Sequence, residues 1–259
     1  MKAQATVCEG VSVCAEVLSA AETAAAPLVA LEDLRFAWEP DAPAVIDIGE
    51  LRVARGERVF VAGPSGCGKS TLLALLTGVA TPQHGAVEVS STRLDRLGGA
   101  ARDRFRADHV GMIFQQFNLI PYLSVTENVM LPCRFSRQRR ARALDRSASV
   151  KAEAERLLRR LELGPELACK RVTELSVGQQ QRVAAARALM GAPALVIADE
   201  PTSSLDVDLR ETFIDLLFGE CAENRTTLVF VSHDVSLATS FDRTIDLPVF
   251  NRAGRAGGE

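Results

Sequence analysis

A glycine-rich run between residues 63 and 70 has the composition of a phosphate-binding loop. It reads Gly63-Pro64-Ser65-Gly66-Cys67-Gly68-Lys69-Ser70 and matches the pattern GxxxxGK[ST]. In such a loop the backbone N–H groups surround a phosphate chain at the N-terminus of a helix. We expect Lys69 to place its charge near the β and γ phosphates of a nucleotide. Ser70 would offer its hydroxyl to Mg²⁺, with Thr71 beside it.

Two adjacent carboxylates, Asp199 and Glu200, end a second apolar run at 194–198. If that run is a strand, its carboxyl end lies next to the phosphate loop. Asp199 would then belong to the Mg²⁺ shell, and Glu200 would polarise a water for in-line attack on a phosphate. The pair therefore predicts hydrolysis of the bound nucleotide.

The segments around these motifs predict an α/β domain. Continuous apolar runs at 58–62, 194–198 and 227–231 are typical of parallel strands buried on both faces. Alternating segments at 28–38 and 44–53 indicate half-buried strands. Further expected elements are strands at 85–89 and 110–114, helices at 69–77, 150–163, 205–223 and 235–239, and a mostly helical region at 125–190.

These elements suggest three parts along the chain. We expect an N-terminal tail at 1–26, a domain at 27–248 with a helical part at about 115–186, and a C-terminal tail at 249–259, in which the glycine-rich residues 251–259 fray. For the N-terminal tail three interpretations remain open: a disordered segment, a misassigned start and a short amphipathic helix over 11–26.

Composition excludes several classes of protein. The 259 residues are 47% hydrophobic and 24% charged, which is ordinary for a globular domain. The formal net charge of −3 argues against nucleic acid as the main partner. The longest uncharged stretch, 110–126, contains Gln, Asn and Pro, so we expect no membrane span. The six cysteines form no CxxC pair, which argues against zinc and fits a reducing cytosol.

A third motif connects these features to a known family. Leu175-Ser176-Val177-Gly178-Gln179 is similar to LSGGQ, the signature of ATP-binding cassette (ABC) ATPases, and 180–189 matches its continuation. With the phosphate loop and the Asp199-Glu200 pair in this order, the chain resembles an ABC ATPase over nearly all of 28–247. Val177 stands where the family has its first signature glycine. By resemblance, Ser176, Gly178 and Gln179 contact the ATP of a partner subunit.

The resemblance assigns roles to two more ring-bearing residues. Trp38 lies where the family has a tyrosine that stacks on adenine, and Phe36 is the alternative. His233, in Val231-Ser232-His233-Asp234, matches the histidine that contacts the γ-phosphate.

Two loops of the family are also recognisable. Gln115 is similar to the glutamine that touches Mg²⁺ and connects the nucleotide to the membrane partner, with Gln116 as the alternative. Ser204-Leu205-Asp206 resembles the loop that crosses to the other subunit.

The resemblance implies a fold and a way of working. The fold would be a P-loop NTPase with a RecA-like parallel-sheet core, a small antiparallel β subdomain and an inserted α-helical signature subdomain. Two copies would form a homodimer around two ATP molecules, because the family completes each site with the signature of the opposite subunit. ATP hydrolysis would drive a separate integral membrane permease.

The stretch at 117–132 narrows the choice of partner. It is similar to the region after the glutamine loop in ATPases of the LolD/MacB type, whose partners are FtsX-like permeases. We therefore expect a peripheral ATPase at the cytoplasmic face of the inner membrane, acting in export, lipoprotein release or mechanotransmission. An FtsE-like regulator that signals without cargo is the alternative. A soluble cassette protein of translation or DNA repair is a third, although these usually carry two cassettes or long coiled-coil insertions.

Two features have no assigned role. One is a run of arginines: Arg134, Arg137, Arg139, Arg140, Arg142 and Arg146. Two interpretations of this run remain open, a solvated face of a helix and a contact with lipid headgroups or an acidic coupling element. The other feature is Cys67, whose place at a helix N-terminus leaves redox regulation open.

Overall fold

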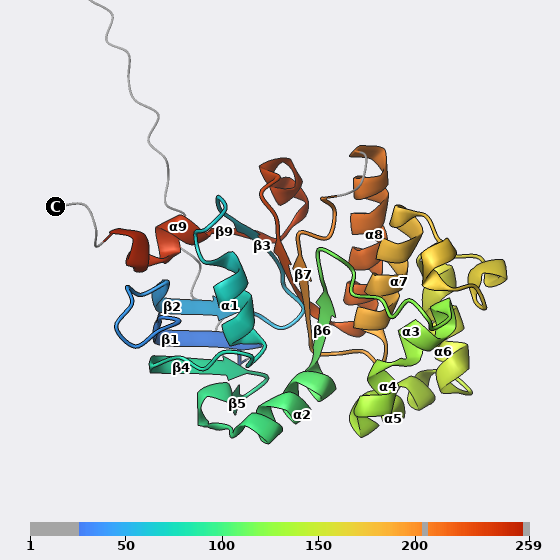
Figure 1. The fold of residues 1–259 in the computed structure, drawn as a ribbon, viewed down its shortest axis with the longest axis horizontal. Coiled ribbons are helices and arrows are strands. Elements are labelled where there is room, and N and C mark those ends of the chain that lie inside the picture. The colour runs from blue at the N-terminus through green and yellow to red at the C-terminus, as the bar shows by residue number, and fades with distance from the viewer. Residues whose placement is uncertain (1–25, 204–206, 256–259) are drawn as a thin grey trace, which may run out of the picture.

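The computed structural model describes residues 26–203 and 207–255, arranged as shown in Figure 1. The expected N-terminal tail up to residue 25 and the segment Ser204-Leu205-Asp206 lie outside the described residues. No helix in the described ranges is long and apolar enough to cross a bilayer.

A parallel sheet forms the centre of the domain. Its strand order is β6-β7-β8-β3-β9, and every pairing is parallel. The bounds are β3 Arg58–Ala62, β6 Val110–Ile113, β7 Leu195–Asp199, β8 Thr227–Val231 and β9 Arg243–Asp246. Because the strands are parallel, the loops that follow β3, β7 and β8 begin at one edge of the sheet. The expected parallel core is confirmed.

An antiparallel sheet lies beside helix α1 (Lys69–Leu76), on the side away from the helices between residues 125 and 189 (Figure 1). Its order is β2-β1-β4-β5, with bounds β1 Val29–Phe36, β2 Ile46–Val53, β4 His84–Val89 and β5 Thr92–Arg93. Strand β1 ends before Trp38, which therefore lies on the loop that leaves this sheet. This is the small antiparallel β part that the sequence predicts.

Side chains alternate between the two faces of the parallel sheet. In β3, Val59 and Val61 pack with α1 and the antiparallel sheet, whereas Phe60 points into a second core shared with the helices. In that second core the Phe60 ring lies 6.0 Å from that of Phe230 and 5.2 Å from that of Phe241. Both faces are covered, which explains why β7 is apolar up to Ala198 and β8 is apolar from Leu228 onward.

Helices cover the remaining surfaces of the parallel sheet. Their bounds are α1 Lys69–Leu76, α2 Gly99–His109, α3 Val125–Met130, α4 Pro132–Phe135, α5 Arg137–Arg146, α6 Val150–Arg160, α7 Val177–Leu189, α8 Val207–Asn224 and α9 Leu247–Phe250. Short 3₁₀ turns are η1 Leu94–Arg96, η2 Pro165–Leu167, η3 Val172–Glu174, η4 Val235–Ser240 and η5 Arg252–Arg255. We call α3 to α7 the helical lobe. The structure differs from expectation in two ways. It contains elements that were not predicted, namely α2, β5, β9 and α9, and the helix expected at 235–239 is 3₁₀.

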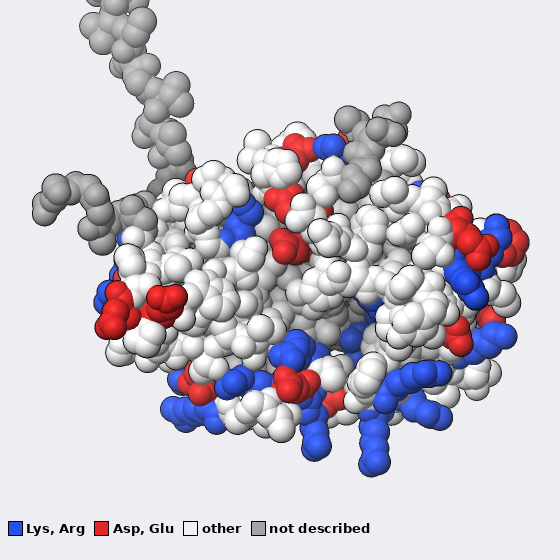
Figure 2. Space-filling model, viewed as in Figure 1, with Lys and Arg blue, Asp and Glu red and all other residues white. Residues whose placement is uncertain are grey.

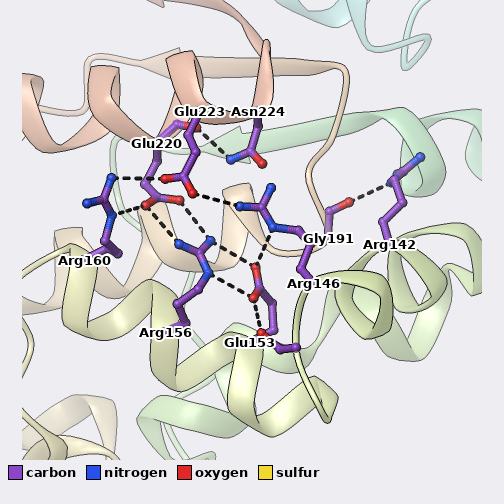
Figure 3. Close-up of polar contacts among 10 residues, drawn as sticks. Arg142, Arg146, Glu153, Arg156, Arg160, Gly191, Glu220, Glu223 and Asn224 are labelled. Carbon is purple, nitrogen blue, oxygen red and sulfur yellow. Dashed lines mark hydrogen bonds and ion pairs between the residues drawn. The ribbon is translucent and has the colours of Figure 1, made fainter.

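A network of ion pairs joins the helical lobe to α8 (Figure 3). Arg156 on α6 lies 3.0 Å from Glu153 and 3.1 Å from Glu220 of α8. Arg160 lies 2.7 Å from Glu220 and 3.1 Å from Glu223. The side chains of Glu153 and Glu220 are only 2% and 1% exposed, so these two carboxylates are part of the interior, while the outer pair of Arg160 and Glu223 is half exposed.

The arginine run does not form a single solvated face, which corrects one of our two interpretations. Arg139 is 3% exposed and donates hydrogen bonds to the carbonyls of Met190, Val110 and Ala188. Burial lowers the pKa of Arg139 to about 10. Arg142 likewise donates to the carbonyl of Gly191 at 2.8 Å. These two guanidinium groups bind backbone carbonyls around β6 and the end of α7.

The end of the chain also departs from the fraying that we expected over 251–259. Residues up to 255 form α9 and η5. Asn251 is 6% exposed and accepts a hydrogen bond from the N–H of Asp47 at 2.8 Å. Its amide donates to the carbonyls of Val45 at 2.8 Å and Cys67 at 3.3 Å. Asn251 therefore ties the start of β2 to the phosphate loop.

Candidate functional site

The glycine-rich run forms a tight loop between β3 and α1. Gly66 and Gly68 have φ of +82° and +102°, a region that L side chains rarely adopt. A Cβ on Gly68 would lie 2.9 Å from the Ile46 side chain, so this position also needs glycine for space. A Cβ on Gly66 would meet nothing within 4 Å, so the loop is open on that side. The Lys69 ammonium donates to the carbonyls of Gly63 and Pro64 at 2.7 and 2.9 Å.

The carboxylate pair and the histidine meet at the same edge of the sheet. Glu200 follows β7 with φ of +47°, and its N–H donates to the carbonyl of Val231 at 2.9 Å. This backbone bond holds the turn after β7 against the end of β8. The ring Nδ1 of His233 lies 2.8 Å from Glu200 Oε2. The Glu200 side chain is 14% exposed, whereas that of His233 is 69% exposed.

The phosphate loop, the pair and the histidine line one cleft of about 420 Å³. Its walls also include Gln115 but not Gln116, which favours Gln115 among the two candidates. The lining residues are Val45, Ser65, Gly66, Gly68, Lys69, Ser70, Thr71, Gln115, Asp199, Glu200 and His233. Segments from five parts of the sequence thus converge on one cavity.

The charges in this cleft fit a nucleotide with a divalent cation. Burial raises the pKa of Asp199, and the neighbouring Glu200 charge raises it further, while Lys69 acts in the opposite direction. A cation between these carboxylates would remove the repulsion that raises the pKa. Carboxylate and hydroxyl oxygens are suitable ligands for Mg²⁺, and Ser70 lines the same cleft. The donor set therefore fits Mg²⁺.

The aromatic candidates differ in exposure. Trp38 is 61% exposed and does not belong to the lining of the cleft, whereas Phe36 is 5% exposed and packs in the core. Their rings meet edge to face at 5.0 Å. Of the two, only Trp38 presents a free ring face to a base.

The signature lies elsewhere on the same chain. Ser176 caps α7 and forms a capping box with Gln179, at 3.3 Å and 3.0 Å. Neither Ser176 nor Gly178 lines the nucleotide cleft. Val177 is 48% exposed at the start of the helix, so its side chain does not crowd the chain's own site. The structure therefore does not bring the signature and the phosphate loop of one chain together.

Arg187 is a residue that the motifs contained but that we did not single out. It lies near the end of α7 and donates to the carbonyls of Asn118 and Phe117, both at 2.6 Å. Phe117 and Asn118 both have positive φ, 58° and 49°. Burial lowers the pKa of Arg187. This guanidinium connects the signature helix to the loop that follows Gln115.

Comparison with known proteins identifies the family. The model of the family described as ABC transporter matches residues 47–203. The chain belongs to the ABC transporter ATP-binding family. It is an ABC ATPase, with the α/β cassette fold that the sequence predicts.

Relatives of this ABC ATPase include proteins of the predicted group. YbbA of Escherichia coli K12, an uncharacterized ABC transporter ATP-binding protein, is 43% identical over 198 residues, covering 76% of this chain and 83% of the relative. The lipoprotein-releasing system ATP-binding protein LolD of Xylella fastidiosa Temecula1 is 41% identical over 203 residues, covering 78% and 81%. The resemblance to the LolD/MacB-type group is thus confirmed.

Solved cassettes share the fold of this ABC ATPase. The dimeric structure of MJ0796, described as a bacterial ABC transporter cassette, has a TM-score of 0.70 at 32% identity, covering 85% of this chain and 95% of that one. A dimeric post-hydrolysis state of MJ0796 bound to ADP and Pi has a TM-score of 0.69 at 33% identity.

Proposed function

We propose that this ABC ATPase works as a homodimer that holds two Mg·ATP between the phosphate loop of one copy and the signature of the other. One observation carries the proposal. Lys69, Asp199 and Glu200 share a cleft that Ser176 of the same chain does not reach. Each chain therefore carries two complementary half-sites, and the dimeric relatives support a second copy as the missing half.

Within the site, Glu200 orients and deprotonates the attacking water. The water oxygen bonds to the γ-phosphorus as the bond to the bridging oxygen breaks, ADP leaves, and the water proton passes to the Glu200 carboxylate. His233 holds one carboxylate oxygen through its Nδ1, which leaves the other oxygen for the water. Lys69 and the loop N–H groups stabilise the charge on the phosphates.

Three residues are suited to hold the metal: Ser70, Asp199 and Gln115. When bound, Mg²⁺ neutralises charge on the β and γ oxygens. Trp38 is the proposed platform for adenine. The remaining loop residues, Gly63, Pro64, Ser65, Gly66, Cys67, Gly68 and Thr71, and the partner's signature residues Ser176, Gly178 and Gln179, complete the proposed ATP contacts.

The proposed membrane partner is an FtsX-like permease. The ATPase would bind this permease at the cytoplasmic face of the inner membrane, and ATP hydrolysis would drive export, lipoprotein release or mechanotransmission. The likeness to LolD supports this group. A second cleft of about 570 Å³ supports the place of contact. It lies between α2, β6 and α4, and Phe114 and Asn118, which flank Gln115, line it. A permease element in this cleft would contact the loop that carries Gln115.

Co-purification of the chain with the permease encoded beside it tests this proposal. We expect a stable complex, weakened by Leu131→Ser, which changes a residue lining the second cleft. Val79→Ser is the matched control, because Val79 is 62% exposed and lies outside that cleft. A complex that tolerates Leu131→Ser as well as the control would contradict the place of contact. A neighbouring permease that never co-purifies would contradict the partner.

A further inference from the structure

The edge of the molecule formed by η1, α2, α4 and α5 carries a group of exposed arginines. We define the basic rim as Arg96, Arg104, Arg134, Arg137 and Arg140, all of which are exposed. Figure 2 shows Lys and Arg side chains projecting along this edge, below the positions that α2, α4 and α5 take in Figure 1. The rim combines residues of two regions that lie about thirty to forty positions apart in the sequence.

The guanidinium groups of the rim are not paired with carboxylates of the described residues, although hydrogen bonds with Ser124 and, to a smaller extent, the charge of Arg134 lower the pKa of Glu127. None of the rim's five guanidinium groups makes an ion pair or side-chain hydrogen bond with a residue that the structure describes. Their neighbours differ in this respect, because Arg106 pairs with Asp103 and Arg139 is buried against carbonyls. The positive charge at this edge is therefore available to an external partner.

Helix stability does not account for the placement of these arginines. Helix α5 begins at Arg137, has no acidic residue in its first turn, and carries Arg139 and Arg140 next. The positive end of a helix dipole favours acidic side chains at this position and disfavours basic ones. One carboxylate of the chain, Asp108, lies at this end, because it accepts a hydrogen bond from the N-cap residue Ser136. It is buried, however, so it does not account for the exposed guanidinium groups of Arg137 and Arg140.

An aromatic residue lies inside the basic rim. Phe135 on α4 is 77% exposed and, together with Arg104, lines the second cleft. Aromatic rings next to basic side chains suit the headgroup layer of a membrane, where one part of the side chain is apolar and the other charged. Each basic residue near an anionic leaflet adds a similar increment to binding.

We propose that the basic rim binds the anionic headgroups of a lipid bilayer, with Phe135 entering the headgroup layer. The formal net charge of the chain is −3, so the attraction comes from this local group and not from the chain as a whole. The orientation of the domain, with the basic rim facing the bilayer, rests on the proposed function, because a permease bound in the second cleft brings the bilayer to the same edge. Lipid binding itself needs neither the permease nor ATP.

Vesicle sedimentation with the full chain tests the proposal. We expect binding to vesicles of phosphatidylcholine mixed with phosphatidylglycerol, no binding to phosphatidylcholine alone, and loss of binding at high salt. Arg134→Gln, Arg137→Gln and Arg140→Gln combined should weaken binding on the order of 100-fold. Phe135→Ser should weaken it while the salt dependence remains.

A charge-matched control separates the effect of the rim's charge from the effect of the net charge of the chain. Arg35, Arg55 and Arg159 are exposed, and their combined replacement by Gln changes the net charge by the same amount at other places. The proposal requires this variant to bind as the wild type does. Equal weakening in both triple variants would overturn it. So would a failure of the wild type to bind anionic vesicles, which would point to an acidic permease element as the partner of the rim.

The ATPase activity of both triple variants in solution keeps this inference separate from the proposed function. Normal ATPase activity without vesicle binding would overturn the lipid proposal alone. Vesicle binding by a chain without ATPase activity would overturn the proposed function alone.

Discussion

At the scale of single residues, Lys69 is the most direct test of the nucleotide site. We expect Lys69→Ala to weaken Mg·ATP binding roughly 10- to 100-fold, because a charged hydrogen-bond donor to phosphate is lost. Equilibrium binding of Mg·ATP measures this. Lys151→Ala is the control, since Lys151 lies on the surface of α6 with a side chain that is 68% exposed. Unchanged affinity in Lys69→Ala would remove the cleft from consideration as the ATP site.

Trp38 offers an optical measurement at the same scale. It is the only tryptophan in the chain, so its emission has no background from other indoles. If adenine stacks on its exposed face, Mg·ATP should change that emission. Trp38→Phe should abolish the signal and retain binding, because an aromatic face remains. Constant emission at saturating ATP, with binding measured independently, would show that adenine binds elsewhere.

At the scale of elements, Arg187 connects two parts of the mechanism. It lies on the helix that Ser176 caps, and it holds the loop that follows Gln115. Arg187→Ala should lower kcat for ATP hydrolysis roughly 10- to 100-fold with a small change in KM. The loop positions the reacting groups, so displacing it slows the reaction more than it weakens ATP binding. Arg187→Lys should restore part of the rate.

The matched control for Arg187 lies on the same helix. Arg182 pairs with Glu162 at 3.0 Å and does not contact the loop after Gln115. Arg182→Ala should leave kcat near the wild-type value. If both variants lose activity equally, the loss reflects the helix and not the contact with the loop.

The ion-pair network of Figure 3 predicts how stability depends on pH. Burial alone would raise the pKa of Glu220, but hydrogen bonds and charge from Arg156 and Arg160 outweigh burial and lower it. A carboxylate with a lowered folded-state pKa stabilises the fold above its unfolded pKa, about 4.3. That contribution is lost as the pH falls through the lowered value.

Glu220→Gln should therefore reduce the free energy of unfolding by about 1–3 kcal/mol at neutral pH. Below about pH 4.3, the free energy of unfolding of this variant should fall less steeply with decreasing pH than that of the wild type. Urea unfolding at several pH values measures both effects. Glu162→Gln is the control, because the Glu162 side chain is 56% exposed where it pairs with Arg182. A Glu220→Gln variant that declines with acid as steeply as the wild type would contradict the role of the network.

The elements also show which parts of the molecule the sequence can predict. The phosphate loop and the strand ending at Asp199 were recognisable because their function needs particular residues close together in sequence. The roles of Asn251 and Arg139 depend on partners 206 and 51 positions away. No local pattern marks such contacts, so one was expected in a fraying tail and the other on a basic surface. Arg187 lay inside a recognised motif, but its partners are about 70 positions away.

At the scale of the whole molecule, the central claim is that two chains close around two ATP molecules. Size-exclusion chromatography of Glu200→Gln with Mg·ATP tests this claim most directly. Removing the water-activating carboxylate typically slows a reaction by about 10²- to 10⁴-fold, while Lys69 and the phosphate loop still bind ATP. The account predicts an ATP-dependent dimer, and a monomer again when Ser176→Arg is added to block the signature. A monomer of Glu200→Gln at saturating ATP, or near-normal hydrolysis by that variant, would contradict the account.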